Sequence, residues 1–435
     1  MHLKIEKIVP GGWGLAKMNG KVIFVPYVLP NEIVKAKIFL EKKDYAFAEI
    51  IEIISPSPQR ISPICPHFGV CGGCDYQHIP YDLQVKIKEN LFKDEIVRQL
   101  GKEIIDVVKK IIPATNPFFY RNRIHLKIKR ERHKVHLGFF KKNTHELIPL
   151  EKCFLAIPAI NEILIMLKTI LKTYAAIANQ IKTIEIFFSP NEEKGIIILH
   201  TLIEINKKYL KNMAEKLIDS LPALKDVLIK HSAFTYPRSL FDKGYTESGL
   251  FFKINNFKVI CYPGVFFQVN TDQNKKLLNI VAELANLSGN EKILELYAGM
   301  GNLSLLLASK ANKLIGLDNN KLAVRNANYN AQLNKVRAFF KKIDVDKGIK
   351  DFLKDETLFD CLVLDPPRQG CLNALKQTLN IIKPKKIIYV SCHPATLARD
   401  LRFLSHIGYK IKYIQPIDMF PQTHHIEAVA MAVSS

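Results

Sequence analysis

The alternation of hydrophobic and polar residues divides this chain of 435 residues into three parts. In the first part, residues 21–27 and 32–40 alternate between apolar and polar side chains, and Gly, Asn and Pro residues separate the runs. Short alternating runs divided by turn residues predict closely spaced β-strands. We therefore predict a small OB-like barrel over residues 1–58, which ends in a Ser-Pro-Ser-Pro linker at residues 55–58.

The last part, residues 262–435, alternates between segments of helical and of strand character. Strands are predicted at Lys292–Leu296, Lys313–Leu317, Cys361–Leu364 and Lys386–Val390, and helices at Lys275–Ala285 and Leu303–Ser309. This alternation is typical of an α/β domain with a parallel, doubly wound sheet.

The part between them, residues 59–261, is mixed and is predicted to be a central α+β domain. It contains a Lys-rich helical stretch at Tyr81–Leu100 and strands at Thr183–Ser189 and Gly195–Thr201. No internal repeat or low-complexity tract interrupts this three-part organisation.

The charge of the chain suggests a polyanionic partner. The formal net charge is +22, with 63 Lys and Arg against 41 Asp and Glu, and phosphate neutralisation drives nucleic-acid binding. From residue 121 to 142 there are nine Lys or Arg residues and one acid, Glu131, with aromatic residues on both sides. Such a strip suits single-stranded RNA, and we expect Arg121, Arg123 and Lys127 to contact it. A solvated strand face in a Lys-rich protein is the alternative explanation.

The overall composition is that of an ordinary globular protein. Hydrophobic residues make up 48% and charged residues 24% of the chain. No uncharged apolar run is long enough to cross a bilayer, and the charged N-terminal residues do not form a signal peptide. We expect a cytoplasmic protein without a membrane partner.

A glycine-rich turn follows the predicted strand at Lys292–Leu296. Gly299 and Gly301 let the backbone approach a ligand closely, although the third glycine of the dinucleotide fingerprint is absent. Asp318 ends the next strand, where an acid commonly holds a ribose diol. The pattern resembles the S-adenosylmethionine pocket of Rossmann-like methyltransferases. Asp344, after the next apolar stretch, is expected to meet the adenine, with a solvated loop acid as the alternative.

A second motif, Asp365-Pro366-Pro367, follows the predicted strand Cys361–Leu364. Two prolines after an acid fix an extended turn and prevent helix formation. The motif resembles the fourth motif of nucleic-acid methyltransferases. Enzymes that methylate amino groups usually carry an aromatic residue after the prolines, whereas Arg368 stands there in this chain, which favours carbon methylation.

Cys392 lies at the end of the predicted strand Lys386–Val390, where open α/β sheets bind their ligands. Carbon 5 of a pyrimidine is a poor nucleophile, but a thiolate that adds to carbon 6 makes an enolate able to attack a methyl sulfonium. A base must then remove the carbon 5 proton, and Glu427 is the candidate. A buried core thiol and a surface carboxylate are the alternatives. The sequence from Ser391 to Asp400 favours the catalytic reading.

Four thiols form a group of their own: Cys65, Cys71, Cys74 and Cys153. The first three have the spacing Cys-x5-Cys-x2-Cys, which predicts a metal or cluster site completed by a distant fourth ligand. Disulfides are unfavourable in a reducing compartment, and the spacing alone also permits structural zinc.

Together these motifs resemble the RNA uracil-5-methyltransferase family, over essentially the whole chain. The matching segments are Cys65–His78, Phe266–Asn270, Glu295–Ser304, Asp365–Gly370, Ser391–Asp400 and Phe420–Glu427. The chain looks most similar to the branch that acts on bacterial 23S ribosomal RNA, whose members carry an N-terminal TRAM domain and an iron–sulfur cluster.

The resemblance implies a class I methyltransferase that methylates carbon 5 of a uracil in 23S ribosomal RNA, at uracil 1939, through a covalent adduct between Cys392 and carbon 6. It implies a monomer, with Phe266 stacking in the target-base pocket. It also implies a 4Fe–4S cluster held by the four cysteines. The residues implied to contact S-adenosylmethionine are Gln268, Tyr297, Asn302, Asp318, Asp344 and Asp365.

Three residues depart from the pattern of the family. His393 replaces a usual Asn, Gln422 a usual His, and Ala298 a frequent Cys. Archaeal relatives with the same accessory features modify the T-loop uridine of transfer RNA, so this substrate stays open. A cytosine-C5 methyltransferase is less favoured because the Pro-Cys and Thr-Cys motifs of that class are absent. A non-catalytic RNA-binding protein is the third alternative.

Overall fold

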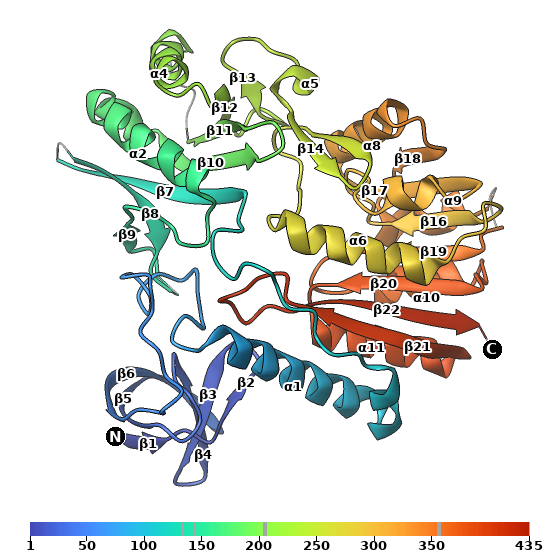
Figure 1. Ribbon diagram of the computed structural model, residues 1–435, viewed down its shortest axis with the longest axis horizontal. Helices are drawn as coiled ribbons and strands as arrows, with labels where there is room; N and C mark the ends of the chain where they lie inside the picture. The colour runs from blue at the N-terminus through green and yellow to red at the C-terminus, as the bar shows by residue number, and fades with distance from the viewer. Residues whose placement is uncertain (133, 143, 203–206, 355–357, 435) are drawn as a thin grey trace.

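The computed structural model describes residues 1–132, 134–142, 144–202, 207–354 and 358–434 (Figure 1). Three sheets account for most of the described strands. A small curled sheet lies at the N-terminal end, a second sheet stands beside it, and a third carries helices on both faces (Figure 1).

The N-terminal sheet contains six strands in the order β1-β5-β6-β4-β3-β2. Their bounds are β1 His2–Lys4, β2 Lys7–Val9, β3 Trp13–Met18, β4 Lys21–Pro26, β5 Ile33–Glu41 and β6 Tyr45–Ser55. The sheet curls around a core that includes Leu3, Ile5, Val25 and Val34. The strands predicted at residues 21–27 and 32–40 are confirmed as β4 and β5. We call this unit the barrel.

The central sheet contains seven strands in the order β13-β12-β11-β10-β7-β8-β9. Their bounds are β7 Arg123–Glu131, β8 Lys134–Phe140, β9 Leu147–Pro149, β10 Ile181–Ser189, β11 Lys194–Thr201, β12 Leu224–Lys230 and β13 Arg238–Ser239. Helices α2 (Pro158–Thr173) and α4 (Lys207–Ser220) pack on one face of this sheet through an apolar core. The short helices α3 (Ala175–Ala178) and α5 (Tyr245–Ser248) lie in connections.

The third sheet has the order β18-β17-β16-β19-β20-β22-β21. The strand bounds are β16 Lys292–Leu296, β17 Lys313–Asp318, β18 Ala338–Lys342, β19 Cys361–Leu364, β20 Lys386–Ser391, β21 Tyr409–Ile417 and β22 Glu427–Ser434. The first five strands in this order are parallel, but β22 runs antiparallel to both of its neighbours. The strands predicted at residues 292–296, 313–317, 361–364 and 386–390 are confirmed as parallel neighbours, whereas the sequence did not indicate the antiparallel direction of β22.

Helices cover both faces of the third sheet, which makes it a doubly wound α/β unit. On one face lie α6 (Thr271–Ala285), α7 (Ser304–Ala308) and α8 (Lys321–Leu333). On the other lie α1 (Tyr81–Leu100), α9 (Val345–Phe352), α10 (Leu372–Leu379) and α11 (Pro394–His406).

Three segments from the central part of the sequence pack on the unit of the third sheet. Helix α1 lies against α11, and residues 108–112, which follow the 3-10 helix Lys102–Val107, run alongside β21. The hairpin of β14 (Leu250–Ile254) and β15 (Phe257–Cys261) packs on α8. The division at residues 58 and 261 stays a prediction about which parts fold on their own.

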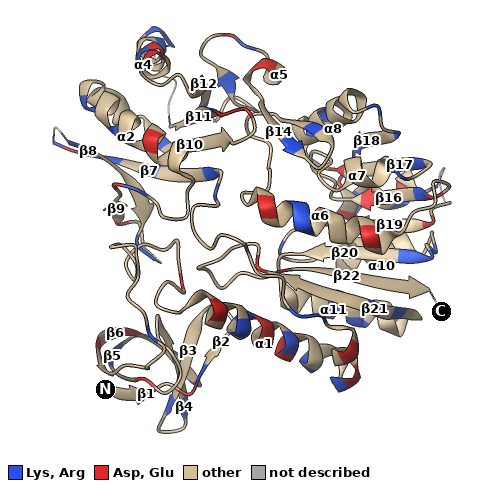
Figure 2. Cartoon of the chain, viewed as in Figure 1, with Lys and Arg blue, Asp and Glu red and all other residues tan. Residues whose placement is uncertain are grey.

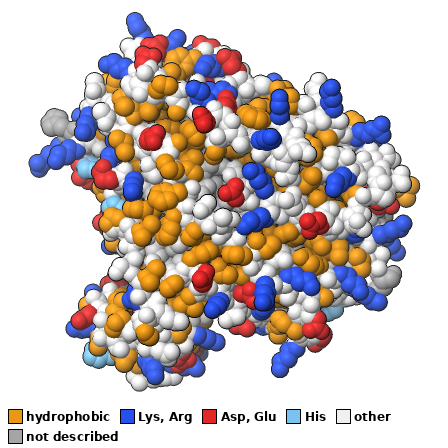
Figure 3. Space-filling view, in the orientation of Figure 1, with side chains coloured by type: hydrophobic (Ala, Val, Ile, Leu, Met, Phe, Trp, Pro, Cys, Tyr) orange, Lys and Arg blue, Asp and Glu red, His pale blue; other side chains and the backbone are white. Residues whose placement is uncertain are grey.

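The positive charge is spread widely over the molecule. Lys and Arg residues occur on all three sheets in Figure 2, and on the face shown in Figure 3 their side chains are scattered among apolar side chains. Among the described residues, no helix is both long enough and apolar enough to cross a membrane.

Candidate active site

The predicted nucleophile and base meet where β20 ends and β22 begins. These strands are antiparallel, and Ser391 pairs with Ala428 at the last recorded position of the register. One step further, Cys392 stands opposite Glu427. The charge of Glu427 acts on the Cys392 thiol, so two residues distant in the sequence face the same crevice.

The Cys392 thiol lies half-buried just before helix α11. The Nδ1 atom of His393 accepts a hydrogen bond from the backbone N–H of Thr396 at 3.4 Å and so caps this helix. His393 therefore performs the capping role in which Asn is favoured. Burial raises the pKa of the Cys392 thiol to about 11, and the charges of Glu427 and Asp365 add to this effect, whereas Arg368 opposes it.

Glu427 is buried at the first position of β22. Burial raises the pKa of its carboxyl group well above the ordinary value, and the charge of Asp365 contributes further. A carboxylate with a raised pKa is a stronger base than one in water. The site therefore holds a thiol and a base whose pKa values are both set by desolvation.

Three more carboxyl groups lie at or near neighbouring strands of the third sheet. Burial raises the pKa of Glu295 on β16 to about 8 and that of Asp365, directly after β19, to about 7. The charge of Asp318, at the end of β17, raises both values. Ser304 donates a hydrogen bond to Glu295. A cation placed near these desolvated carboxyl groups would favour their charged forms, and the sulfonium of S-adenosylmethionine is such a cation.

The glycine turn after β16 has the open geometry expected of a ligand cradle. Gly299 has a φ of +56° and donates its N–H to Asp318 Oδ2 at 2.9 Å. A Cβ atom added at Gly299 would meet nothing within 4 Å. Tyr297 has a φ of +62°, and its hydroxyl donates to Asp346 Oδ1 at 3.1 Å. The backbone of the turn is thus accessible at Gly299, and the Asp318 carboxylate lies directly beside it.

The other predicted cofactor contacts occupy different settings. Asn302 exchanges two hydrogen bonds of 2.9 Å with Asn274 on α6. Gln268 is buried three residues before the start of α6. Asp344 is exposed at the start of α9 and borders a cavity of about 630 Å³.

Arg368 contacts His425, two residues before Glu427, and its charge acts on Cys392. Arg368 Nη2 donates to His425 Nδ1, with 2.8 Å between the atoms. Burial, with the neighbouring charges of His424 and Arg368, lowers the pKa of His425 to about 3, which keeps its imidazole neutral and able to accept this hydrogen bond. The charge of Arg368 in turn favours the thiolate of Cys392.

The predicted RNA-contacting residues fall into two groups. Phe266 is 70% exposed and lines a cavity of about 700 Å³ together with Arg121 and Lys127. Arg123 also borders this cavity, but its side chain is buried and forms an ion pair with Glu185 at 3.1 Å. The packing thus engages Arg123 inside the fold, whereas Phe266 and Lys127 face the open space.

The side chains of the basic strip that lie on β7 alternate between the two faces of the sheet. Ile124 and Leu126 point into the core under α2, while His125 and Lys127 on the opposite face border the cavity. Period-two alternation places one set of side chains on each face of a strand. The part of the strip on β7 therefore presents its charge to the cavity and keeps its apolar residues in the core.

The four cysteines of the predicted cluster line this same cavity. Burial raises the pKa of Cys71 to about 11 and that of Cys74 to about 12, and the Cys153 thiolate contributes to both. Gln77 Nε2 donates to Cys74 Sγ at 3.2 Å. In the arrangement of the described residues, no three His, Cys, Asp or Glu side chains are close enough to hold a metal ion. The four sulfur donors fit a thiolate-bound metal or cluster, but their side chains are not arranged close enough together to ligate one.

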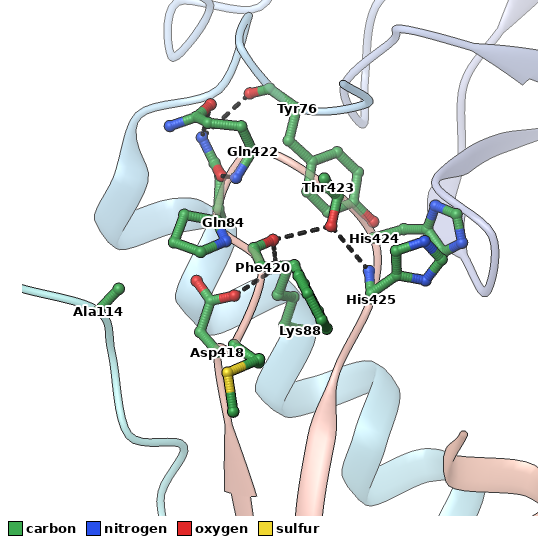
Figure 4. A network of polar contacts seen from close by, with 12 residues as sticks. Tyr76, Gln84, Lys88, Ala114, Asp418, Phe420, Gln422, Thr423, His424 and His425 are labelled. Atoms are coloured by element: carbon green, nitrogen blue, oxygen red, sulfur yellow. Dashed lines mark hydrogen bonds and ion pairs between the residues drawn. The ribbon is translucent and has the colours of Figure 1, made fainter. Parts of the chain in front are cut away.

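The loop of residues 418–426 directly precedes Glu427, and side chains of α1 bind it (Figure 4). Lys88 Nζ lies 2.6 Å from Asp418 Oδ1, and both side chains are fully buried. Gln84 Nε2 donates to Gln422 Oε1 at 2.9 Å. Gln422, one of the departures from the family pattern, thus joins the loop to α1.

The cysteine segment reaches the same loop. Asp75, which follows Cys74, accepts hydrogen bonds from the backbone and side chain of His424 and from Lys142 Nζ. The sequence did not indicate Asp75, Lys88 or Glu295 as parts of the site. For Glu295 the available signal was a charged residue between Leu294 and Leu296, because such a residue is rarely buried without a partner.

Comparison with known proteins identifies the family. The sequence profile of the tRNA (uracil-5-)-methyltransferases matches residues 82–433. The chain belongs to this family. A TRAM domain profile matches residues 1–51, which assigns the barrel. The protein is therefore an RNA (uracil-5) methyltransferase with an S-adenosylmethionine-binding fold.

Individual relatives agree with this assignment. An uncharacterized RNA methyltransferase of Halalkalibacterium halodurans is 31% identical over 442 residues, which cover 99% of this chain and 96% of the relative. One of Aquifex aeolicus is also 31% identical, with 99% and 98% covered. The fold is similar to that of Pyrococcus abyssi tRNA (uracil-54, C5)-methyltransferase in complex with S-adenosyl-L-homocysteine, with a TM-score of 0.75, 24% identity and 99% of both chains covered.

Proposed function

We propose that this enzyme methylates carbon 5 of uracil in RNA through a covalent adduct of Cys392. The observation that carries the proposal is the opposition of Cys392 and Glu427 across the β20–β22 pair. A thiol and a buried base at one edge of the sheet are the two groups that this chemistry requires.

Cys392, Glu427 and Arg368 each have a distinct role in the proposed reaction. The Cys392 thiolate adds to carbon 6 of the uracil, which turns carbon 5 into a nucleophile. Bound S-adenosylmethionine supplies the electrophilic methyl group. Glu427 then takes the proton from carbon 5, and the electron pair of that bond re-forms the carbon 5–carbon 6 double bond as the Cys392 sulfur leaves. Arg368 favours the thiolate at the start of this sequence.

The cofactor is proposed to lie over the glycine turn. Asp318 is the candidate for its ribose, and Asp365, near the Cys392 thiol, is the candidate for its cationic end. Tyr297, Asn302, Gln268 and Asp344 complete the proposed contacts. The open backbone at Gly299 and the raised pKa of Asp365 support this placement.

The proposed substrate is 23S ribosomal RNA, with uracil 1939 as the target. The TRAM domain together with four grouped cysteines supports this choice. The T-loop uridine of transfer RNA is the alternative, which the name of the Pyrococcus abyssi enzyme favours. A binding protein without activity is disfavoured because Cys392, Glu427 and Asp365 are retained together.

We also propose that Cys65, Cys71, Cys74 and Cys153 hold a 4Fe–4S cluster with a structural role. Four thiols and no disulfide at one cavity support it, and all-thiolate ligation suits iron–sulfur clusters. Iron and acid-labile sulfide are measured on anaerobically purified protein. Zinc without sulfide would replace the cluster by a structural zinc site.

Methyl-transfer mapping tests the activity. The purified enzyme is given S-adenosylmethionine with 23S ribosomal RNA or transfer RNA lacking 5-methyluridine, and the products are located by nucleoside mass spectrometry and fragment mapping. New 5-methyluridine in 23S ribosomal RNA supports the full proposal. The same product in transfer RNA alone would keep the mechanism and change the substrate, and the absence of any C5-methylated pyrimidine would contradict both.

A further inference from the structure

Five aromatic rings cluster on the outer surface of the barrel, around Phe47. The aromatic patch consists of Trp13, Phe24, Phe39, Tyr45 and Phe47. The ring centroids of Trp13, Phe24, Tyr45 and Phe39 lie 5.0, 5.2, 5.7 and 6.3 Å from that of Phe47. The rings come from β3, β4, β5 and β6, so folding of the barrel brings them together.

The patch inverts the usual distribution of residue sizes. On β6, Ala46 and Ala48 point into the barrel core and are buried, while the rings of Tyr45 and Phe47 face outward. Phe39 is 52% exposed and Tyr45 is 39% exposed. Large rings stabilise a fold most when they are buried, so the barrel core does not account for their place on the outside.

A local irregularity of β5 supports the same conclusion. The β5–β6 register shifts between Ile38 and Leu40, which sets Phe39 at a bulge. Bulges re-aim side chains and recur at functional positions. Lys35 and Lys37, four and two residues before Phe39, are exposed on the same strand, so positive charge borders the rings.

One residue, Lys142, lies between the aromatic patch and the cavity lined by Phe266. Lys142 lines the cavity that also contains Phe266, and its Nζ atom lies 5.1 Å from the centroid of Trp13. The same atom lies 3.0 Å from Asp75, which holds His424 in the loop before Glu427. Lys142 therefore links the edge of the cavity to the barrel at Trp13.

We propose that the aromatic patch stacks unpaired nucleotides that flank the target uridine. The proposal rests on the RNA methyltransferase function and adds the substrate form: single-stranded RNA next to the target, since only unpaired bases offer their faces to aromatic side chains. The adjacent lysines and the net charge of +22 complement the phosphates.

A double variant, Phe39→Ala with Tyr45→Ala, tests the proposal on the full-length enzyme. Both side chains are exposed, so their removal spares the barrel core. The control is Ile51→Ala, which removes a 57% exposed side chain from β6 outside the patch. Fluorescence anisotropy with a labelled single-stranded oligouridylate measures the dissociation constant, and a matched RNA duplex serves as the comparison probe.

The double variant is expected to weaken oligouridylate binding by roughly 10-fold or more, with duplex binding and the control unchanged. The slope of affinity against salt concentration stays the same, because stacking releases no counterions. Trp13 is the only tryptophan of the chain, so quenching of its fluorescence by oligouridylate, absent with the duplex, reports binding at the patch.

Equal affinity of the double variant and the control for oligouridylate would overturn the proposal. So would a defect seen only on assembled ribosomal particles, which would assign the patch to a protein partner. Binding to oligouridylate is independent of turnover, so a chain that binds it through the patch but makes no 5-methyluridine would contradict the proposed function and leave this inference standing.

Discussion

Asp75 Oδ2 accepts two hydrogen bonds from His424, from its backbone N–H at 3.1 Å and from its Nδ1 atom at 2.7 Å. Asp75 directly follows Cys74, and His424 lies three residues before Glu427. The cysteine segment and the loop before the proposed base, Glu427, are therefore connected.

Asp75→Ala is expected to lower kcat by about 10- to 100-fold, because a small displacement of a catalytic group suffices for such a loss. The KM for RNA should change less. The measurement is steady-state methyl transfer, with Asp44→Ala, an exposed acid of the barrel, as the control. If kcat is retained in a folded Asp75→Ala protein, the connection does not position Glu427.

Cys392→Ala should abolish methyl transfer while RNA affinity stays within about twofold, since the thiol reacts with the base but contributes little contact area. Activity and oligonucleotide binding are measured in parallel. Cys361→Ala, which removes a buried thiol from β19, is the matched control. Residual turnover by the Cys392→Ala enzyme would show that another group is the nucleophile.

Glu427→Gln should trap the covalent intermediate, because carbon 5 keeps its proton and the Cys392 sulfur is then unable to leave. A denaturing gel with labelled RNA detects the adduct as a band of reduced mobility. The adduct should depend on S-adenosylmethionine and vanish in the double variant with Cys392→Ala. Intact binding without any adduct would assign the base to a different residue.

The pH dependence follows from the raised pKa of Cys392, about 11. Below that value the thiolate fraction grows by about tenfold per pH unit, so kcat/KM should rise with pH across the neutral and mildly alkaline range. The charge of Glu427 raises this pKa, so Glu427→Gln should lower it and speed alkylation of Cys392 at neutral pH. Iodoacetamide labelling followed by peptide mass spectrometry measures the rate at this thiol. An unchanged or slower rate would contradict the coupling.

The Lys88–Asp418 pair predicts a stability effect. Lys88→Met leaves the buried Asp418 carboxylate without its cation, which should lower the free energy of unfolding by about 3–5 kcal/mol. The double variant Lys88→Met with Asp418→Asn should be milder. Lys93→Met on the same helix removes a partly exposed pair with Glu89 and should cost about 1 kcal/mol or less. Urea denaturation compares the three variants. Equal denaturation midpoints would show that the buried Lys88–Asp418 pair does not stabilise the fold more than the exposed pair does.

Much of the architecture could be predicted because it depends on local patterns. The helix at Tyr81–Leu100 and the strands Lys292–Leu296 and Cys361–Leu364 are confirmed with the same bounds. Gly or Pro residues near their ends define such elements without reference to the rest of the chain, as Pro80 and Gly101 do for the helix. The TRAM domain and the enzyme family are confirmed as well.

The pairing of distant segments was not predictable from those patterns. Nothing local shows that β22 inserts antiparallel between β20 and β21, and this insertion is what brings Glu427 to Cys392. Arg123 belongs to the basic strip by sequence, but in the fold it is buried and forms an ion pair with Glu185 on the adjacent strand β10. The roles of Cys392, Glu427 and the four cysteines stay predictions.

The sequence by itself determined the order of the elements, the family and the residue types available for chemistry, because periodicity, turn residues and short motifs are properties of neighbouring positions. Only the tertiary structure decided which charges are buried, which partners share a hydrogen bond and which aromatic rings remain outside. Those outcomes depend on desolvation and on contacts between residues far apart in the chain, such as Asp75 with His424 and Lys88 with Asp418.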